Sequence, residues 1–204
     1  MHTTTTATNL NAPGATLFPA TTMPGLRDRA FYLWSAAFIA GNIALPQLCH
    51  LASLGGKIAL PLYFFTLVAA CSCGWRAGLI TAIASPLLNH ALFAMPPAPL
   101  LPAILTKSLL LALLAPLALR LCGQRRRHLP LALLLAVTGY QTLGGLFEWA
   151  WTGNLAAALE DLTLGWPGML FQVAGGWLIL RGLEKQFFHP SSAAAPAADG
   201  PEQE

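Results

Sequence analysis

Residues 85 to 107 read SPLLNHALFAMPPAPLLPAILTK, and this stretch decides how the chain must fold. Two apolar runs flank a group of prolines at positions 96, 97, 99 and 102. Proline is tolerated in the first turn of a helix but removes a hydrogen bond from its interior, so the group predicts a short, rigid turn between two helices. Asn89, His90 and Lys107 are polar side chains in this apolar hairpin, and each needs a partner there.

The composition of the whole chain predicts that this hairpin lies in a membrane. Of the 204 residues, 55% are hydrophobic and 9% are charged, whereas about a quarter of residues are charged in a typical water-soluble domain. A helix crosses a bilayer with about 17–25 apolar residues, and the chain lacks the alternating pattern of a membrane barrel. We therefore expect an all-α integral membrane protein with six transmembrane helices, at about 30–48, 58–74, 77–94, 100–121, 129–151 and 166–183.

The two ends of the chain differ in composition from this expected membrane domain, which covers residues 27–187. Residues 1–26 are predicted to form a polar tail, because they lack the basic start and unbroken apolar run of a signal peptide. Residues 188–204 are rich in alanine, proline and acidic side chains, a composition typical of a disordered tail.

Basic residues indicate the orientation of the helices, because lysine and arginine prefer cytoplasmic loops. With six helices in the expected positions, nine of the eleven basic residues fall on one side of the membrane. Lys57 lies in a loop on the other side and Lys107 lies within a helix. Both termini are therefore expected in the cytoplasm. The nine are Arg27, Arg29, Arg76, Arg120, Arg125, Arg126, Arg127, Arg181 and Lys185.

In this orientation, polar side chains from several helices gather in the outer half of the membrane. Gln141 lies near the middle of its helix and shares a face with Glu148, seven positions further on. The inner half has no matching polar track, so we expect a small substrate-binding pocket that opens outward rather than a pore. The candidate substrate-binding residues are Asn42, His50, Tyr63, Asn89, His90, Lys107, Gln141, Glu148 and Gln172.

Other interpretations of these residues stay open at the level of sequence. Amide and phenol groups in membrane helices also bond neighbouring helices together, which stabilises packing by roughly 1 kcal/mol or less. Lys107 and Glu148 are more costly to bury, so they contact a ligand or water, pair with each other, or reach the membrane surface.

The chain shows no motif typical of an enzyme. It contains no phosphate-binding loop, no His-Glu-x-x-His and no Gly-x-Ser-x-Gly sequence. Cys71 and Cys73 form a Cys-x-Cys pair, but no further cysteine or histidine at ligand spacing completes a metal site. We therefore expect a binding or transport subunit that is not an enzyme, has no cofactor of its own and takes its energy from partners.

The first predicted helix offers a surface for such a partner. Ala36 and Ala40 are small residues one turn apart, and such spacing lets another helix approach closely. The block from GGKIALPLYFF (residues 55–65) through GWRAGLITAIASPLLNHALFAMPPAPLLPAIL (residues 74–105) resembles the substrate-binding S components of energy-coupling factor (ECF) vitamin transporters.

This resemblance implies a six-helix bundle in the bacterial cytoplasmic membrane with both termini inside. It implies contact with a transmembrane T component through Ala36 and Ala40, and two ATP-binding-cassette ATPases that use ATP. A water-soluble vitamin or a related precursor would be held near the outer face by the loop PQLCHLASLGGK (residues 46–57) and by the last three helices. Two other classes of protein fit the residues: a small integral-membrane enzyme or scaffold, and an independent secondary carrier.

Overall fold

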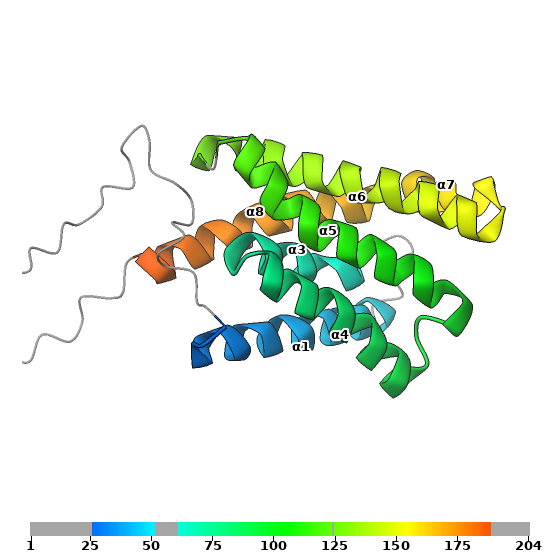
Figure 1. The fold of residues 1–204 in the computed structure, drawn as a ribbon, viewed down its shortest axis with the longest axis horizontal. Coiled ribbons are helices and arrows are strands. Elements are labelled where there is room, and N and C mark those ends of the chain that lie inside the picture. Colours follow the sequence, from blue (N-terminus) through cyan, green and yellow to red (C-terminus); the bar gives the residue numbers. More distant parts are fainter. Residues whose placement is uncertain (1–25, 52–60, 124, 189–204) are drawn as a thin grey trace, which may run out of the picture.

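A computed structural model describes residues 26–51, 61–123 and 125–188 of the chain (Figure 1). Within these ranges the chain is helical and contains no strand, which confirms the predicted all-α class. Short 3-10 helices at Pro61–Tyr63, Ala98–Leu100 and Arg126–His128 lead into three of the α-helices. The α-helices are α1 (Arg29–Leu51), α3 (Phe64–Ser72), α4 (Trp75–Phe93), α5 (Leu101–Leu121), α6 (Leu129–Thr152), α7 (Leu155–Thr163) and α8 (Trp166–Phe188).

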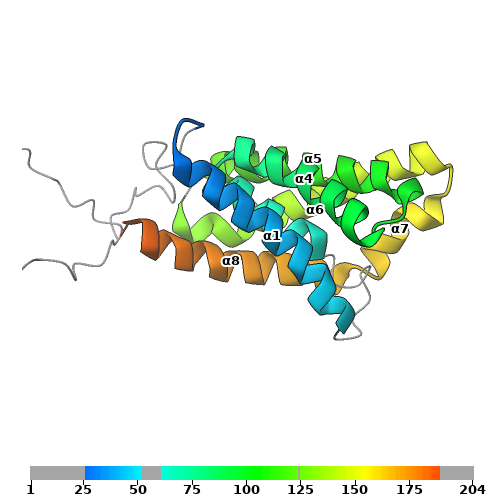
Figure 2. The same ribbon diagram turned by 90° about the horizontal axis from the view of Figure 1, so that it is seen from below.

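Helix α3 lies at the centre of the bundle. It packs against α1, α4, α5 and α8, and α6 packs in turn against α5 and α8 (Figures 1 and 2). Leu67, Val68, Ala69 and Ala70 of α3 are fully buried. Gly78 of α4 permits the close crossing of α3 and α4, because a Cβ atom there would lie 2.7 Å from Cβ of Ala70. A short helix of apolar and small residues thus forms the core around which the longer helices are arranged.

The outer surface of the bundle is also apolar. On α6, Leu131, Leu134 and Leu143 are between 46% and 52% exposed. The hydroxyl groups of Thr138 and Thr142, on the same surface, donate to the carbonyl oxygens of Leu134 and Thr138 at 2.8 Å each. Both hydroxyls are therefore satisfied without water, as a helix surface in contact with lipid requires.

Two helical stretches are long and apolar enough to cross a membrane, Ala98–Leu121 and Arg126–Thr152. The other four predicted spans are also helical where they are described, but that they cross a membrane stays a prediction. Residues 58–60 of the second span, residues 52–57 of the loop after α1, and nearly all of the two predicted tails lie outside the described residues.

Helix α7 was not predicted, because its nine residues are too few to span a bilayer. It follows a turn at Gly153 and packs back against α6 (Figure 1). The carbonyl oxygen of Ala158 lies 3.4 Å from the position that a Cβ atom would take at Gly145. The segment between the last two predicted spans is therefore a helix that covers the end of α6.

The proline-rich hairpin folds as its sequence predicts. Helix α4 ends at Phe93, and Ala94 closes it in a left-handed conformation, with φ of 53° and its N–H bonded to the carbonyl oxygen of His90. Pro102 lies in the first turn of α5, where no intrahelical N–H is needed. The prolines therefore end one helix and begin the next.

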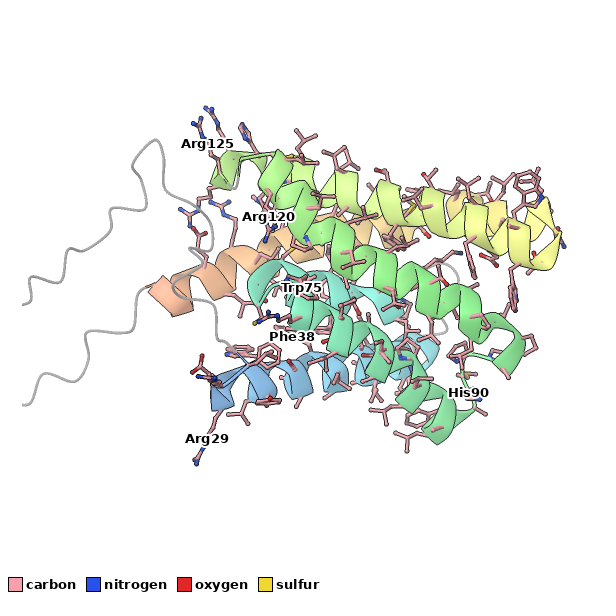
Figure 3. The ribbon with its side chains drawn as sticks, in the orientation of Figure 1. Arg29, Phe38, Trp75, His90, Arg120 and Arg125 are labelled. Carbon is pink, nitrogen blue, oxygen red and sulfur yellow. The ribbon has the colours of Figure 1, made fainter. Side chains whose placement is uncertain are left out.

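The basic residues gather at one end of the bundle. Figure 3 shows Arg29, Arg120 and Arg125 at this end and His90 at the opposite end. Nε of Arg126 donates to Oε2 of the buried Glu184 at 3.0 Å, which joins the turn before α6 to the end of α8. We call this end, where α1 begins and α8 finishes, the basic end. That it faces the cytoplasm stays a prediction.

Candidate functional site

An ion pair between α5 and α6 is the centre of the candidate site. Nζ of Lys107 lies 2.5 Å from Oε2 of Glu148, and the exposed fractions of the two side chains are 2% and 11%. Gly144, one turn before Glu148, makes room for the lysine, because a Cβ atom at Gly144 would collide with Cγ of Lys107. Of the alternatives left open by the sequence, the structure shows pairing between Lys107 and Glu148.

Gln141 lies on the same buried face of α6 as Gly144 and Glu148. Its side chain is 1% exposed, and neither its amide nitrogen nor its amide oxygen has a hydrogen-bond partner among the described residues. Ser108, next to Lys107 on α5, also has a buried hydroxyl group without a partner there. A buried polar group without a partner lowers the stability of a protein by about 1–3 kcal/mol. Such a group therefore needs an explanation, for example a polar molecule that binds there or strain in the fold.

A second polar contact joins α6 to α8 beside Gln141. Oη of Tyr140 donates to Oε1 of Gln172 at 3.1 Å, and both side chains are buried. The ring of Tyr63, just before α3, lies 5.3 Å from the ring of Tyr140 between centroids. Tyr140 was not among the predicted site residues, because consecutive residues of a helix point in different directions and its place directly before Gln141 gave no signal for it. We call Lys107, Ser108, Tyr140, Gln141, Glu148 and Gln172 the polar cluster.

Asn42 belongs to a different group. Its amide nitrogen donates to Oγ1 of Thr66 at 2.9 Å and to Oγ of Ser85 at 3.2 Å, and its amide oxygen accepts from the backbone N–H of Phe65 at 2.9 Å. That N–H lies in the first turn of α3, where it has no partner within the helix. Asn42 therefore ties α1 to α3 and α4 and caps α3, a role that needs no ligand.

Asn89 and His90 also contact neighbours other than the polar cluster. Oδ1 of Asn89 accepts from Nε2 of Gln47 on α1 at 3.5 Å, the upper limit for a hydrogen bond. Nδ1 of His90 donates to the carbonyl oxygen of Pro96 at 2.7 Å, which holds the proline-rich turn against the end of α4. His50 lies in the last turn of α1, and its side chain falls outside the described part of the chain.

The structure thus divides seven of the nine candidate residues between two sides of the bundle, while His90 lies at the proline-rich turn and the side chain of His50 is not described. Lys107, Gln141, Glu148 and Gln172 lie between α5, α6 and α8, with Tyr63 close to them. Asn42 and Asn89 lie between α1 and α4, and with Thr66, Ser85 and Gln47 we call them the α1 clip. The polar cluster combines an ammonium, a carboxylate, a hydroxyl, amides and a phenol within the buried part of the bundle.

The predicted partner surface lies on the outside of α1. Ala36 and Ala40 are exposed, whereas Phe31, Ser35 and Phe38 of the same helix are buried. The two alanines therefore do not pack the described core of this chain, and they remain candidates for contact with another helix.

The described residues add no other centre of chemistry. Within these ranges, no group of three or more His, Cys, Asp or Glu side chains is placed to hold a metal ion. The four cysteines are free, and Cys71 and Cys73 are buried in the core. No protein-family model, curated protein or solved structure matches this chain, so its function has to be argued from the polar cluster and the surface.

Proposed function

We propose that this chain is the membrane-embedded substrate-binding subunit of an ATP-driven importer of the ECF type, for a water-soluble vitamin or a related micronutrient. The observation that carries the proposal is the polar cluster, in which one face of α6 contributes to a buried ion pair and also carries the amide of Gln141, which has no partner among the described residues. Ionisable groups inside a membrane protein are costly and usually mark a site for a ligand or an ion.

The arrangement along α5 and α6 favours a receptor over a pore. Between the polar cluster and the basic end, the buried residues of these helices are apolar, including Leu111 and Ala115 on α5 and Leu133 and Ala136 on α6. A channel would need polar groups along this path. A substrate that enters from the His90 end therefore meets a closed apolar floor, and its release on the other side needs a partner.

The partners follow from the proposal. Ala36 and Ala40 would contact a transmembrane T component, and two ATP-binding-cassette ATPases would supply the energy. In this proposal the chain crosses the bacterial cytoplasmic membrane six times, with the basic end in the cytoplasm. The exposed Trp149, Trp151 and Trp166, near the opposite end, would then lie at the outer membrane surface.

The first test is to identify what the chain binds and what drives uptake. The chain is purified in a mild detergent and analysed by native mass spectrometry, where we expect a retained small molecule. Cells that produce the chain together with an ECF module should accumulate that molecule only when the ATPases are active. Turnover of a substrate by the purified chain would instead indicate an enzyme, and gradient-driven uptake into liposomes without an ATPase would indicate a carrier.

The partner surface is tested separately with Ala36→Trp and Ala40→Trp. Because both positions are exposed, a bulky side chain should fit the isolated subunit but prevent the close approach of a partner helix. We expect uptake to be lost while ligand binding to the isolated chain stays normal. Ala174→Trp, the same substitution at an exposed alanine of α8, is the matched control, and it should reduce uptake less. Equal loss of binding and uptake would contradict the proposed interface.

A further inference from the structure

The side chain of Gln141 is set apart from the other buried amides of the chain. Within the described ranges it is the one amide side chain with both polar atoms buried and without a hydrogen-bond partner. Gln172, of the same residue type and equally buried on the neighbouring helix, accepts a bond from Tyr140. Asn42 uses both ends of its amide, with two bonds donated and one accepted.

A primary amide offers a donor and an acceptor side by side in one plane. One group that satisfies both at once is another amide edge with N–H and C=O on the same side, as in a lactam, an imide or a cyclic urea. A single hydroxyl or carboxylate satisfies one end of the glutamine and leaves the other unbonded.

The charges two turns from Gln141, on the same face of α6, restrict the ligand further. Lys107 and Glu148 neutralise each other at 2.5 Å, so a ligand next to them does not need to bring a charge to compensate for either. An added anion would compete with Glu148 for the lysine, and an added cation would compete with Lys107 for the carboxylate. Both would leave one buried charge without its partner. An uncharged group avoids this cost.

We propose that Gln141 binds the amide edge of an uncharged heterocycle, of the lactam, imide or cyclic urea class, on the face of α6 that also carries the intact Lys107–Glu148 pair. This inference rests on the proposed function, because it names the chemistry of the substrate that the binding subunit would take. The rings of Tyr140 and Tyr63 lie on the adjacent side of the cluster, where a flat ring would find aromatic contacts.

The first part of the test is the stability of the ligand-free protein. Gln141→Leu replaces two unbonded polar atoms by apolar atoms of similar volume, so we expect an equal or higher melting temperature. Gln172→Leu is the matched control, because it removes a partner of Tyr140 and should lower the melting temperature. A clear fall for Gln141→Leu, like that of the control, would overturn the inference, since the amide would then already be satisfied in the empty protein.

The second part uses small probes that differ only in their N–H groups. Uracil and 2-piperidone carry the amide edge, whereas 1,3-dimethyluracil and N-methyl-2-piperidone have the same rings with the N–H blocked. At millimolar concentration, we expect the first two to raise the melting temperature of the wild-type protein and the methylated pair to do so much less. Gln141→Leu should remove this difference and weaken the binding of the N–H probes by about tenfold or more. If the N–H probes raise the melting temperature of the wild-type protein no more than the methylated probes do, the inference is overturned.

The failure of this inference can be told apart from the failure of the proposed function. If the N–H probes bind through Gln141 but no ATPase-dependent uptake is found, the proposed ligand class is supported and the proposed importer function is contradicted. If uptake depends on the ATPases but the retained molecule lacks an amide edge, the proposed importer function is supported and the proposed ligand class is contradicted.

Discussion

The polar cluster and the α1 clip are two buried polar groups in one small bundle, and they differ in how completely they are bonded. In the α1 clip, Asn42 makes three hydrogen bonds and joins three helices. In the polar cluster, Lys107 and Glu148 pair with each other, but both polar atoms of Gln141 lack a partner among the described residues. Buried amide side chains thus have all their hydrogen bonds on one side of the bundle and lack them on the other.

This difference distinguishes a buried amide that has a structural role from one that is available for binding. A buried amide that is fully bonded stabilises helix packing and has no capacity left for a ligand. A buried amide that is not bonded lowers stability and is kept where it serves another purpose. We therefore assign Asn42 to the fold and propose Gln141 for binding, although the sequence made them equal candidates.

The largest expected effect comes from breaking the ion pair. Lys107→Met keeps most of the side-chain length but leaves the carboxylate of Glu148 without its cation, in a place with little access to water. Removal of one member of a buried pair typically costs about 3–5 kcal/mol, so we expect a loss of that size in the free energy of unfolding. Thermal and denaturant unfolding of the purified protein in detergent measure it.

The double variant Lys107→Met with Glu148→Gln is the control for this prediction. It removes both charges, so most of the lost stability should return even though the ion pair is absent. A single Lys107→Met variant as stable as the wild-type protein would show that the two charges do not depend on each other.

A smaller effect is expected from the α1 clip. Asn42→Ala removes three hydrogen bonds and leaves the N–H of Phe65 without its cap, so unfolding should become easier by about 2 kcal/mol. Asn89→Ala, which loses a single bond at 3.5 Å, should cost about 0.5 kcal/mol or less. Because Asn42 is assigned to the fold, the affinity for a ligand should not change in variants that stay folded. Lost affinity with normal stability would place Asn42 in the binding site instead.

A further effect, smaller than that of Asn42→Ala, concerns the room that Gly144 leaves for Lys107. Gly144→Ala brings a Cβ atom into Cγ of the lysine, so the lysine stem must shift, and we expect a loss of about 1–2 kcal/mol. Gly182→Ala in α8 is the matched control, because nothing lies within 4 Å of the added atom. In a helix this change should be neutral or stabilise by up to about 1 kcal/mol. Equal effects at both positions would show that Lys107 does not pack over Gly144.

Much of the fold could be predicted because it follows from local patterns. The apolar runs and the prolines at 96, 97, 99 and 102 correctly predicted where α4 ends and α5 begins. Helix α7 was not predicted, because nine residues are too few to span a bilayer. Its position also depends on packing against α6, which the local sequence does not show. The central place of α3 was also not predictable, since a short apolar helix reads the same in the sequence whether it faces lipid or other helices.

By itself, the sequence determined the helical class, the positions of the long helices and the residues whose burial would be costly. Those properties depend on hydropathy and on the backbone chemistry of proline, which act over a few neighbouring residues. Only the tertiary structure decided that Lys107 faces Glu148, that Asn42 caps α3 and that Gln141 has no partner among the described residues. Hydrogen bonds between helices depend on which faces meet across the bundle, and residues 41 positions apart, such as Lys107 and Glu148, carry no local signal of their contact.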